Sequence, residues 1–285
     1  MELHVDLDLM SEMMNRVVLS PDSSAERQFL PDVEEVTGGL LLGDRGYYGN
    51  SYLQALGTAG GFFIVRGKSD MNPLILYAIT PDGREVKRFR NQPLKAVAKR
   101  LSRYEHLDMR VRFKGREGKA PFECRLVVHP NLRKDDTPRY LATNLDPETF
   151  TAQHISDGYR LRWQVELLFK EWKSHANLHA FDTSNPYIAE GLIWASLCAA
   201  TLKRYCAHMT QRLANVAVST QIVAKCIHHV LGDVLHALIH QPRRLNANVA
   251  RAIEYLANNA RRAHPKRDRR TGRLKLGLEH VYGAA

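Results

Sequence analysis

The hydrophobic periodicity of the chain changes once along its 285 residues, and this change limits the folds that it can adopt. Near the start, Leu3, Val5, Leu7 and Leu9 alternate with polar residues, which is typical of a half-buried strand. Short apolar runs and helix-length segments then alternate up to residue 71. After Pro147 the apolar residues recur almost wholly at helical spacing. The pattern predicts an α/β sheet flanked by helices, followed by an all-helical part.

The apolar runs place the expected elements. Up to residue 71, strands are predicted at 3–9, 13–19, 40–42 and 62–65, with helices at 22–30 and 50–56. Beyond it, β-like runs occur at 74–79, 84–90, 109–113 and 123–129, with a helical pattern at 94–101. The turn residues Pro81, Asp82 and Gly83 predict a hairpin between the first two of these runs. We interpret this stretch as a β-rich insertion rather than as a continuation of the main sheet.

Four parts are therefore expected. Residues 1–71 form the first part of the core, and residues 72–143 form the insertion. Residues 144–260 form the helical second part, with helices at 157–173, 186–213, 219–239 and 246–260. Residues 261–285 form a basic C-terminal tail.

The charge balance favours an acidic polymer as partner. Lys and Arg number 41 against 30 Asp and Glu, a formal net charge of +11 at pH 7. Nucleic acid is the natural candidate, because binding a phosphate backbone releases its counterions. The segment MELHVDLDLM has no cationic leader, and the longest apolar stretch, at 191–202, is too short to span a bilayer. The four cysteines show no C-x-x-C spacing, so we expect a cytoplasmic protein without a membrane partner.

One helix-length segment, Asp157 to Lys173, carries an unusual set of polar residues. Tyr159, Arg162, Glu166 and Lys173 fall within an arc of roughly 60° on one face of a continuous helix. An apolar stripe lies on a different face: Leu161, Val165, Leu168 and Trp172. Periodicity alone favours a solvated face with an ordinary Arg162–Glu166 pair. The same residues could also hold a phosphate backbone and a metal ion.

Two sequence blocks carry a resemblance to a known family. The pattern Y-x2-R-x3-E-x6-K, with its flanks RWQVELLFKEWKS, resembles the signature of bacterial insertion-sequence transposases of the DDE superfamily. Upstream, GGLLLGDRGYYG at Gly38 to Gly49 resembles the strand that bears the second catalytic aspartate of that family, here Asp44. Taken alone, Asp44 is better explained as a cap of the turn after a strand. The two blocks occur in the expected order, and family-like sequence covers most of the chain.

The resemblance implies a fold, a reaction and roles for individual residues. It implies a ribonuclease-H-like mixed sheet and Mg²⁺-dependent cleavage and transfer of DNA strands, for which Mn²⁺ can substitute. Asp44 and Glu166 would be catalytic metal ligands, and Tyr159, Arg162 and Lys173 would contact DNA near the transposon end. The implied partners are transposon-end and target DNA and a second copy of the chain in a synaptic complex. The implied location is the bacterial nucleoid.

One part of the family pattern has no counterpart here. The family has a first catalytic aspartate on an opening strand, upstream of a segment that resembles LHVDLDL at 3–9. The chain begins at that segment, so we expect a truncated or inactive copy without this strand. Asp6 and Asp8 are the nearby substitutes.

Three alternatives stay open. A non-catalytic DNA-binding or inhibitory transposase fragment would keep the basic residues without a complete metal site. An unrelated nuclease is disfavoured, because no P-D…E-x-K array stands out. The pair His236 and His240 has the i,i+4 spacing of two zinc ligands, although a polar helix face explains it better.

Overall fold

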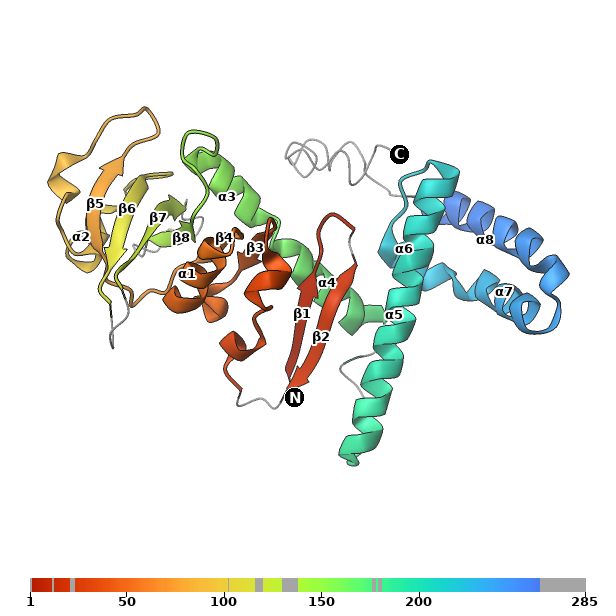
Figure 1. Cartoon of the computed structure of the whole chain (residues 1–285). Coiled ribbons are helices and arrows are strands. Elements are labelled where there is room, and N and C mark those ends of the chain that lie inside the picture. The colour runs from red at the N-terminus through yellow and green to blue at the C-terminus, as the bar shows by residue number, and fades with distance from the viewer. Residues whose placement is uncertain are drawn as a thin grey trace. The chain divides into compact units, whose positions relative to one another are not determined.

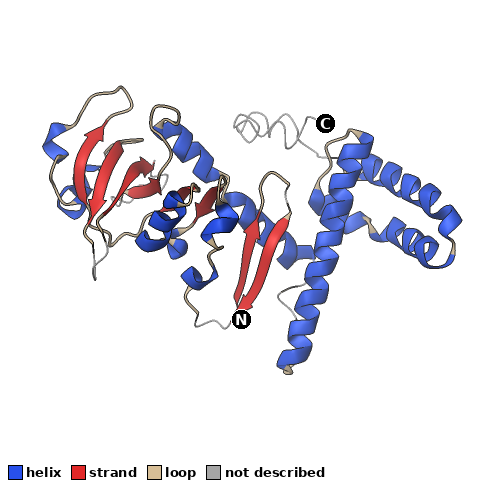
Figure 2. Cartoon of the chain, viewed as in Figure 1, coloured by secondary structure: helices blue, strands red, loops and turns tan. Residues whose placement is uncertain are grey.

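The computed structural model describes residues 2–11, 13–20, 24–101, 103–115, 120–129, 138–175, 178 and 181–261 (Figure 1). It divides into two compact units, Met1–Gln164 and Val165–Ala285. The first unit contains a mixed sheet flanked by helices, and the second is built from helices (Figure 2). This confirms the predicted fold class. The basic tail beyond residue 261 lies outside the described residues.

The chain opens with a separate two-stranded sheet. Strands β1 (Glu2–Leu7) and β2 (Met14–Ser20) pair antiparallel, as the alternation predicted. The predicted helix at 22–30 is wrong, because its described part, 24–30, forms a short 3₁₀ turn, η1 (Glu26–Phe29), instead. Leu30 is extended, at φ −60° and ψ 144°, because the ring of the following Pro31 disfavours a helical conformation before it. A second 3₁₀ turn, η2 (Val33–Val36), leads to the main sheet.

Among the residues that the structure describes, the main sheet has six strands in the order β3-β4-β8-β7-β6-β5. Strands β3 (Leu40–Gly43) and β4 (Phe62–Arg66) pair parallel. The other neighbours pair antiparallel, in the ranges β5 (Leu74–Ile79), β6 (Asp108–Phe113), β7 (Phe122–His129) and β8 (Arg139–Thr143). The strands of 72–143 thus continue the main sheet, and the expectation that they would not do so was wrong. Strand β8, which was not predicted, joins these strands to the main sheet, because it pairs with both β4 and β7.

The segment 84–90 does not form the predicted second strand of a hairpin. It makes one isolated bridge, between Glu85 and Ile79, and then turns into η4 (Lys87–Phe89). Phe89 is fully buried in the core, and Asn91 has φ +58°, a conformation that ends an extended segment. Burial of the Phe89 ring therefore overrides the local strand pattern.

Helices cover both faces of the main sheet. On one face, α1 (Asn50–Thr58) and α2 (Leu94–Leu101) share a core with Phe63 and Val65 of β4. On the other face, α3 (Ala152–Arg160) packs against Ile64 of the same strand. The alternation of β4 side chains between two buried cores explains why Phe63, Ile64 and Val65 are all apolar.

The predicted continuous helix at 157–173 is broken. Helix α3 ends at Arg160, and α4 (Trp163–His175) begins after a turn at Leu161 and Arg162. The amide of Leu161 donates to the Gly158 carbonyl at 3.0 Å, and that of Arg162 to the Tyr159 carbonyl at 3.1 Å. These i to i+3 bonds are of the tighter 3₁₀ type, which helical periodicity does not distinguish. The boundary between the two compact units falls just inside α4, after Gln164.

The second unit is a set of packed helices. Helix α5 (Pro186–Ala214) matches its prediction, with Asn185 capping its first turn, and α8 (Leu245–Asn259) lies close to the predicted range. The single helix predicted at 219–239 is instead two, α6 (Thr220–Cys226) and α7 (His228–His240), bent by 68°. In the part of the chain that is described, no single helix is long and apolar enough to cross a membrane, although α6 and α7 together pass by length and composition.

Candidate active site

Asp44 lies at the carboxyl end of β3, where an α/β sheet commonly places a ligand. Its Oδ1 accepts a hydrogen bond of 2.7 Å from the Arg45 amide and so caps η3 (Arg45–Tyr47). The turn-capping role is therefore real. The side chain is nevertheless 42% exposed, so its carboxylate is accessible to a ligand as well.

Two arginines from different elements flank this carboxylate. Arg66, the last residue of β4, places Nη1 3.7 Å from Oδ1 of Asp44. Arg162, in the turn between α3 and α4, places Nη1 4.0 Å from Oδ2. Arg66 is not among the predicted site residues. A signal for it exists only once β3 and β4 are known to run parallel, because their carboxyl ends then meet at one edge.

Tyr159 completes the surroundings of Asp44. Its hydroxyl donates to Oδ1 at 3.4 Å, and its ring lies 5.6 Å from the Arg162 guanidinium carbon. The side chain is buried against the sheet, and this burial, with the nearby Asp44 carboxylate, raises the pKa of Tyr159 to about 12. The structure thus brings together three of the five predicted site residues: Asp44, Tyr159 and Arg162.

The other two predicted residues belong to the second unit. Glu166 lies in the first turn of α4 and is half-buried, whereas Lys173 lies near its end and is exposed. Seven residues apart, they fall within roughly 20° of each other around the helix axis. They therefore share a face of α4, as predicted. The approach of Glu166 to Asp44 stays a prediction.

Comparison with known proteins identifies the family. A family model described as "Transposase DDE domain" matches residues 1–202. The chain belongs to the DDE transposase family. The matched region includes Asp44 and the whole signature segment from Tyr159 to Lys173.

Several curated transposases are similar to this DDE transposase. "Putative transposase y4zB" of Sinorhizobium fredii (strain NBRC 101917 / NGR234) is 25% identical over 227 residues, which is 80% of this chain and 59% of that protein. The transposase for insertion sequence element IS421 of Escherichia coli is 44% identical over 62 residues, 22% of this chain and 17% of that protein. The transposase for IS231C of Bacillus thuringiensis subsp. berliner is 26% identical over 128 residues, 43% and 26% of the two chains. The chain spans less than two thirds of the length of these relatives.

The donor chemistry of Asp44 suits a hard divalent cation, which prefers carboxylate oxygens. Within the described ranges, however, no group of three or more His, Cys, Asp or Glu side chains is placed to hold a metal ion. His236 and His240 therefore belong to no such group, although their ring centroids lie 5.1 Å apart. Asp44 therefore has the donor chemistry of a single ligand for such a cation.

The two proposed substitutes for a first aspartate differ in their surroundings. Asp8 accepts hydrogen bonds from the Met10 amide at 2.8 Å and the Ser11 hydroxyl at 2.7 Å, and these hold its pKa below the usual value. It therefore acts as a turn cap. Asp6 lies on β1, and burial raises its pKa. Burial, Glu26, Asp6 and Asp44 all act to raise the pKa of Tyr47.

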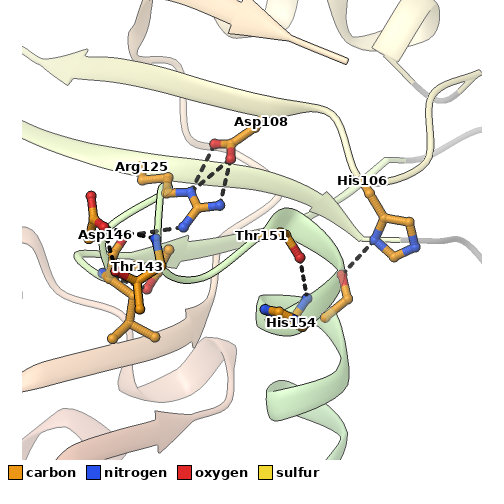
Figure 3. A network of polar contacts seen from close by, with 10 residues as sticks. His106, Asp108, Arg125, Thr143, Asp146, Thr151 and His154 are labelled. Atoms are coloured by element: carbon orange, nitrogen blue, oxygen red, sulfur yellow. Dashed lines mark hydrogen bonds and ion pairs between the residues drawn. The ribbon is translucent and has the colours of Figure 1, made fainter. Parts of the chain in front are cut away.

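A polar network anchors the helix that carries Tyr159 (Figure 3). Arg125, only 4% exposed, donates to the Asp108 carboxylate at 2.6 to 3.0 Å and to the Leu145 carbonyl at 3.1 Å. Thr151 caps α3 by accepting from the His154 amide, and His106 shares a 3.0 Å hydrogen bond with the hydroxyl of Ser156. A hollow of about 860 Å³ lies beside the network. The network ties both the loop before α3 and α3 itself to the sheet.

Proposed function

We propose that this chain is the catalytic core of a DNA transposase that cleaves and transfers DNA strands in cut-and-paste transposition. The observation that carries the proposal is the arrangement around Asp44, a carboxylate at a strand end with Arg66, Arg162 and Tyr159 within 4.0 Å. A structural turn cap does not need two guanidinium groups and a phenol from three separate elements. A site that receives a metal and a phosphate backbone does.

The residues divide between two tasks. Asp44 and Glu166 would be the carboxylate ligands of a divalent metal, Mg²⁺ or in its place Mn²⁺. When bound, the metal pair of such sites activates a water or a DNA 3′-hydroxyl and stabilises the leaving oxygen of an in-line displacement at phosphorus. Arg162 and Lys173 would bind DNA phosphates, the former bidentately and the latter as a point charge. Tyr159 would donate its hydroxyl to a phosphate oxygen.

The wider setting is proposed on the same basis. The parallel pair β3 and β4 in a mixed sheet, with helices on both faces, is compatible with a ribonuclease-H-like core. The net charge of +11 suits transposon-end and target DNA as partners and a place at the nucleoid in the cytoplasm. A homodimer in a synaptic complex would bring two DNA ends together.

A second candidate is a DNA-binding or inhibitory transposase fragment without catalysis. It is favoured by one observation: the described residues contain no group of three or more metal-ligating side chains. Such a protein would keep the arginines around Asp44 and bind DNA. It would lack the coordination needed for cleavage.

A nicking assay on supercoiled DNA separates the two candidates. A transposase core is expected to nick with Mg²⁺ or Mn²⁺, and Asp44→Ala and Glu166→Ala should each abolish nicking while DNA binding persists. Glu34→Ala, at an exposed acid of η2, is the matched control and should nick normally. DNA binding without metal-dependent nicking would favour the non-catalytic candidate. Nicking that survives Glu166→Ala would overturn the assignment of the site.

A further inference from the structure

Helix α4 carries a second acid besides Glu166, and this one is buried. Glu171 is only 7% exposed. Its Oε2 accepts a hydrogen bond of 3.0 Å from the Thr220 hydroxyl, at the start of α6, and one of 3.5 Å from Nη1 of Arg204, on α5. The Arg204 side chain is itself 12% exposed. Three helices of the second unit therefore meet at one carboxylate.

The two acids of α4 point in different directions. Glu171 shares a buried face with Leu168 and Trp172, both 1% exposed, within an arc of roughly 100° at 100° per residue. Glu166 lies roughly 140° away from Glu171 around the axis, on the face that also carries Lys173. Whatever fixes the rotation of α4 on its buried side therefore also fixes the direction of Glu166.

Apolar packing alone does not fix that rotation strongly. Leu168 and Trp172 keep most of their contacts if the helix turns by a few degrees, because dispersion contacts are not directional. A buried carboxylate behaves differently, since it has to keep its hydrogen-bond donors or leave a charge uncompensated. Any turn of α4 that moves Glu171 away from Thr220 and Arg204 is therefore penalised.

We propose that Glu171 is a positioning residue that sets the rotation of α4 and thereby the direction of Glu166. It touches neither substrate nor metal and acts only through the helix. The inference rests on the proposed function, because it takes Glu166 as a ligand that has to meet Asp44.

The test measures position directly. Asp44→Cys and Glu166→Cys are combined in a chain that also carries Cys198→Ser, because Cys198 is exposed. The rate at which a short bifunctional thiol reagent joins the two introduced thiols then reports their approach, without any need for activity. Glu171→Leu, which keeps the volume but loses both bonds, should lower this rate about tenfold. Glu254→Gln, at an exposed acid of α8, is the control and should leave it unchanged.

A kinetic measurement separates positioning from a general loss of stability. In a chain with the native Asp44 and Glu166, Glu171→Leu should lower kcat for strand cleavage about tenfold to a hundredfold. The KM for DNA should change less than kcat, since Lys173 turns with α4 but the other proposed DNA contacts, Tyr159 and Arg162, lie outside this helix. Glu171→Gln, which still accepts from Thr220, should recover part of kcat.

The outcomes distinguish this inference from the function on which it rests. If the thiols at 44 and 166 fail to join with Glu171 present, the two-carboxylate site fails. If they join equally fast in the Glu171→Leu chain, the site stands and the positioning role is overturned. Should Glu171→Leu not fold, Thr220→Val removes one bond at nearly constant size. In folded Thr220→Val a slower reaction supports the proposal, and an unchanged one refutes it.

Discussion

The hydroxyl of Tyr159 donates a hydrogen bond to Oδ1 of Asp44 at 3.4 Å across a sequence separation of 115 residues. Tyr159 reaches this position because α3 packs on the face of the sheet next to Ile64 of β4. The two transposase sequence blocks thus meet in space within the first unit. This contact suggests that the signature tyrosine holds the Asp44 carboxylate, in addition to its proposed contact with DNA.

Tyr159→Phe should leave the fold intact and slow metal-dependent nicking about tenfold. The ring remains buried, whereas a hydrogen bond to a charged group is worth about 1.5–3 kcal/mol and this one, at 3.4 Å, belongs at the low end. Nicking rates and thermal unfolding of the two chains provide the measurement. A variant that nicks at the normal rate would show that the contact with Asp44 plays no part in the reaction.

DNA and metal should each raise the affinity for the other. Arg66 and Arg162 balance the charge of Asp44 in the structure, so a cation placed there adds charge beside two guanidinium groups. Phosphates that engage the arginines relieve this repulsion, with a coupling of about 5- to 100-fold. Mn²⁺ titrations by calorimetry with and without a DNA duplex would measure it.

Arg162→Gln should uncouple the two ligands. The variant is expected to bind Mn²⁺ more tightly than the native chain when DNA is absent and to gain less affinity when DNA is added. Arg243→Gln, at an exposed arginine of the second unit, is the control and should keep the full coupling. Equal Mn²⁺ affinity with and without DNA in the native chain would contradict the idea.

DNA binding should be strongly salt-dependent and largely independent of sequence, because phosphate contacts position a protein without reading bases. Lys173→Gln, at the exposed end of α4, should weaken binding evenly across sequences and reduce the salt slope by about one. Mobility shifts over a range of salt concentrations test this. Tight DNA binding with an affinity that does not change with salt concentration would contradict the proposed contact between Lys173 and DNA phosphates.

Alkaline pH should destabilise the fold. Burial raises the pKa of Tyr159, Tyr47 and Tyr52 to about 12, from an ordinary value of 10. Below pH 10 both states keep these protons and stability is unaffected; above it the unfolded chain ionises first, so stability falls as pH rises from about 10 to 12. Urea unfolding at several pH values would show the decline, and Tyr159→Phe should make it shallower. A flat profile through pH 11 would contradict the burial of these phenols.

Asp108→Ala should destabilise the first unit by about 3 kcal/mol, because it leaves the buried Arg125 guanidinium without its anion. Glu123→Ala removes the acid of a surface cluster with Arg110 and Arg112 and should cost less than about 1 kcal/mol. Denaturant unfolding compares the two. Similar losses for both variants would mean that the network in Figure 3 does not anchor α3.

Local sequence determined the family and most of the elements. The blocks around Asp44 and at 157–173 identified the family, and the run at 94–101 coincides with α2. Such inferences hold because strand and helix patterns repeat over two to four residues, a span that a short window contains. The same reasoning failed where burial of Phe89 or the 3₁₀ turn at Arg162 overrode the local pattern.

Only the tertiary structure decided which residues surround Asp44. Arg66 is a neighbour because β3 and β4 run parallel, and Tyr159 because α3 lies across β4. The short strand β8 joins 72–143 to the main sheet in the same way, through pairing with β4 and β7. Each relation depends on contacts between distant segments, where the gain from burial exceeds the entropy of closing long loops. A sequence window of a few residues does not include these long-range contacts. The local sequence therefore identified Asp44, whereas its contacts with Arg66 and Tyr159 could be found only from the tertiary structure.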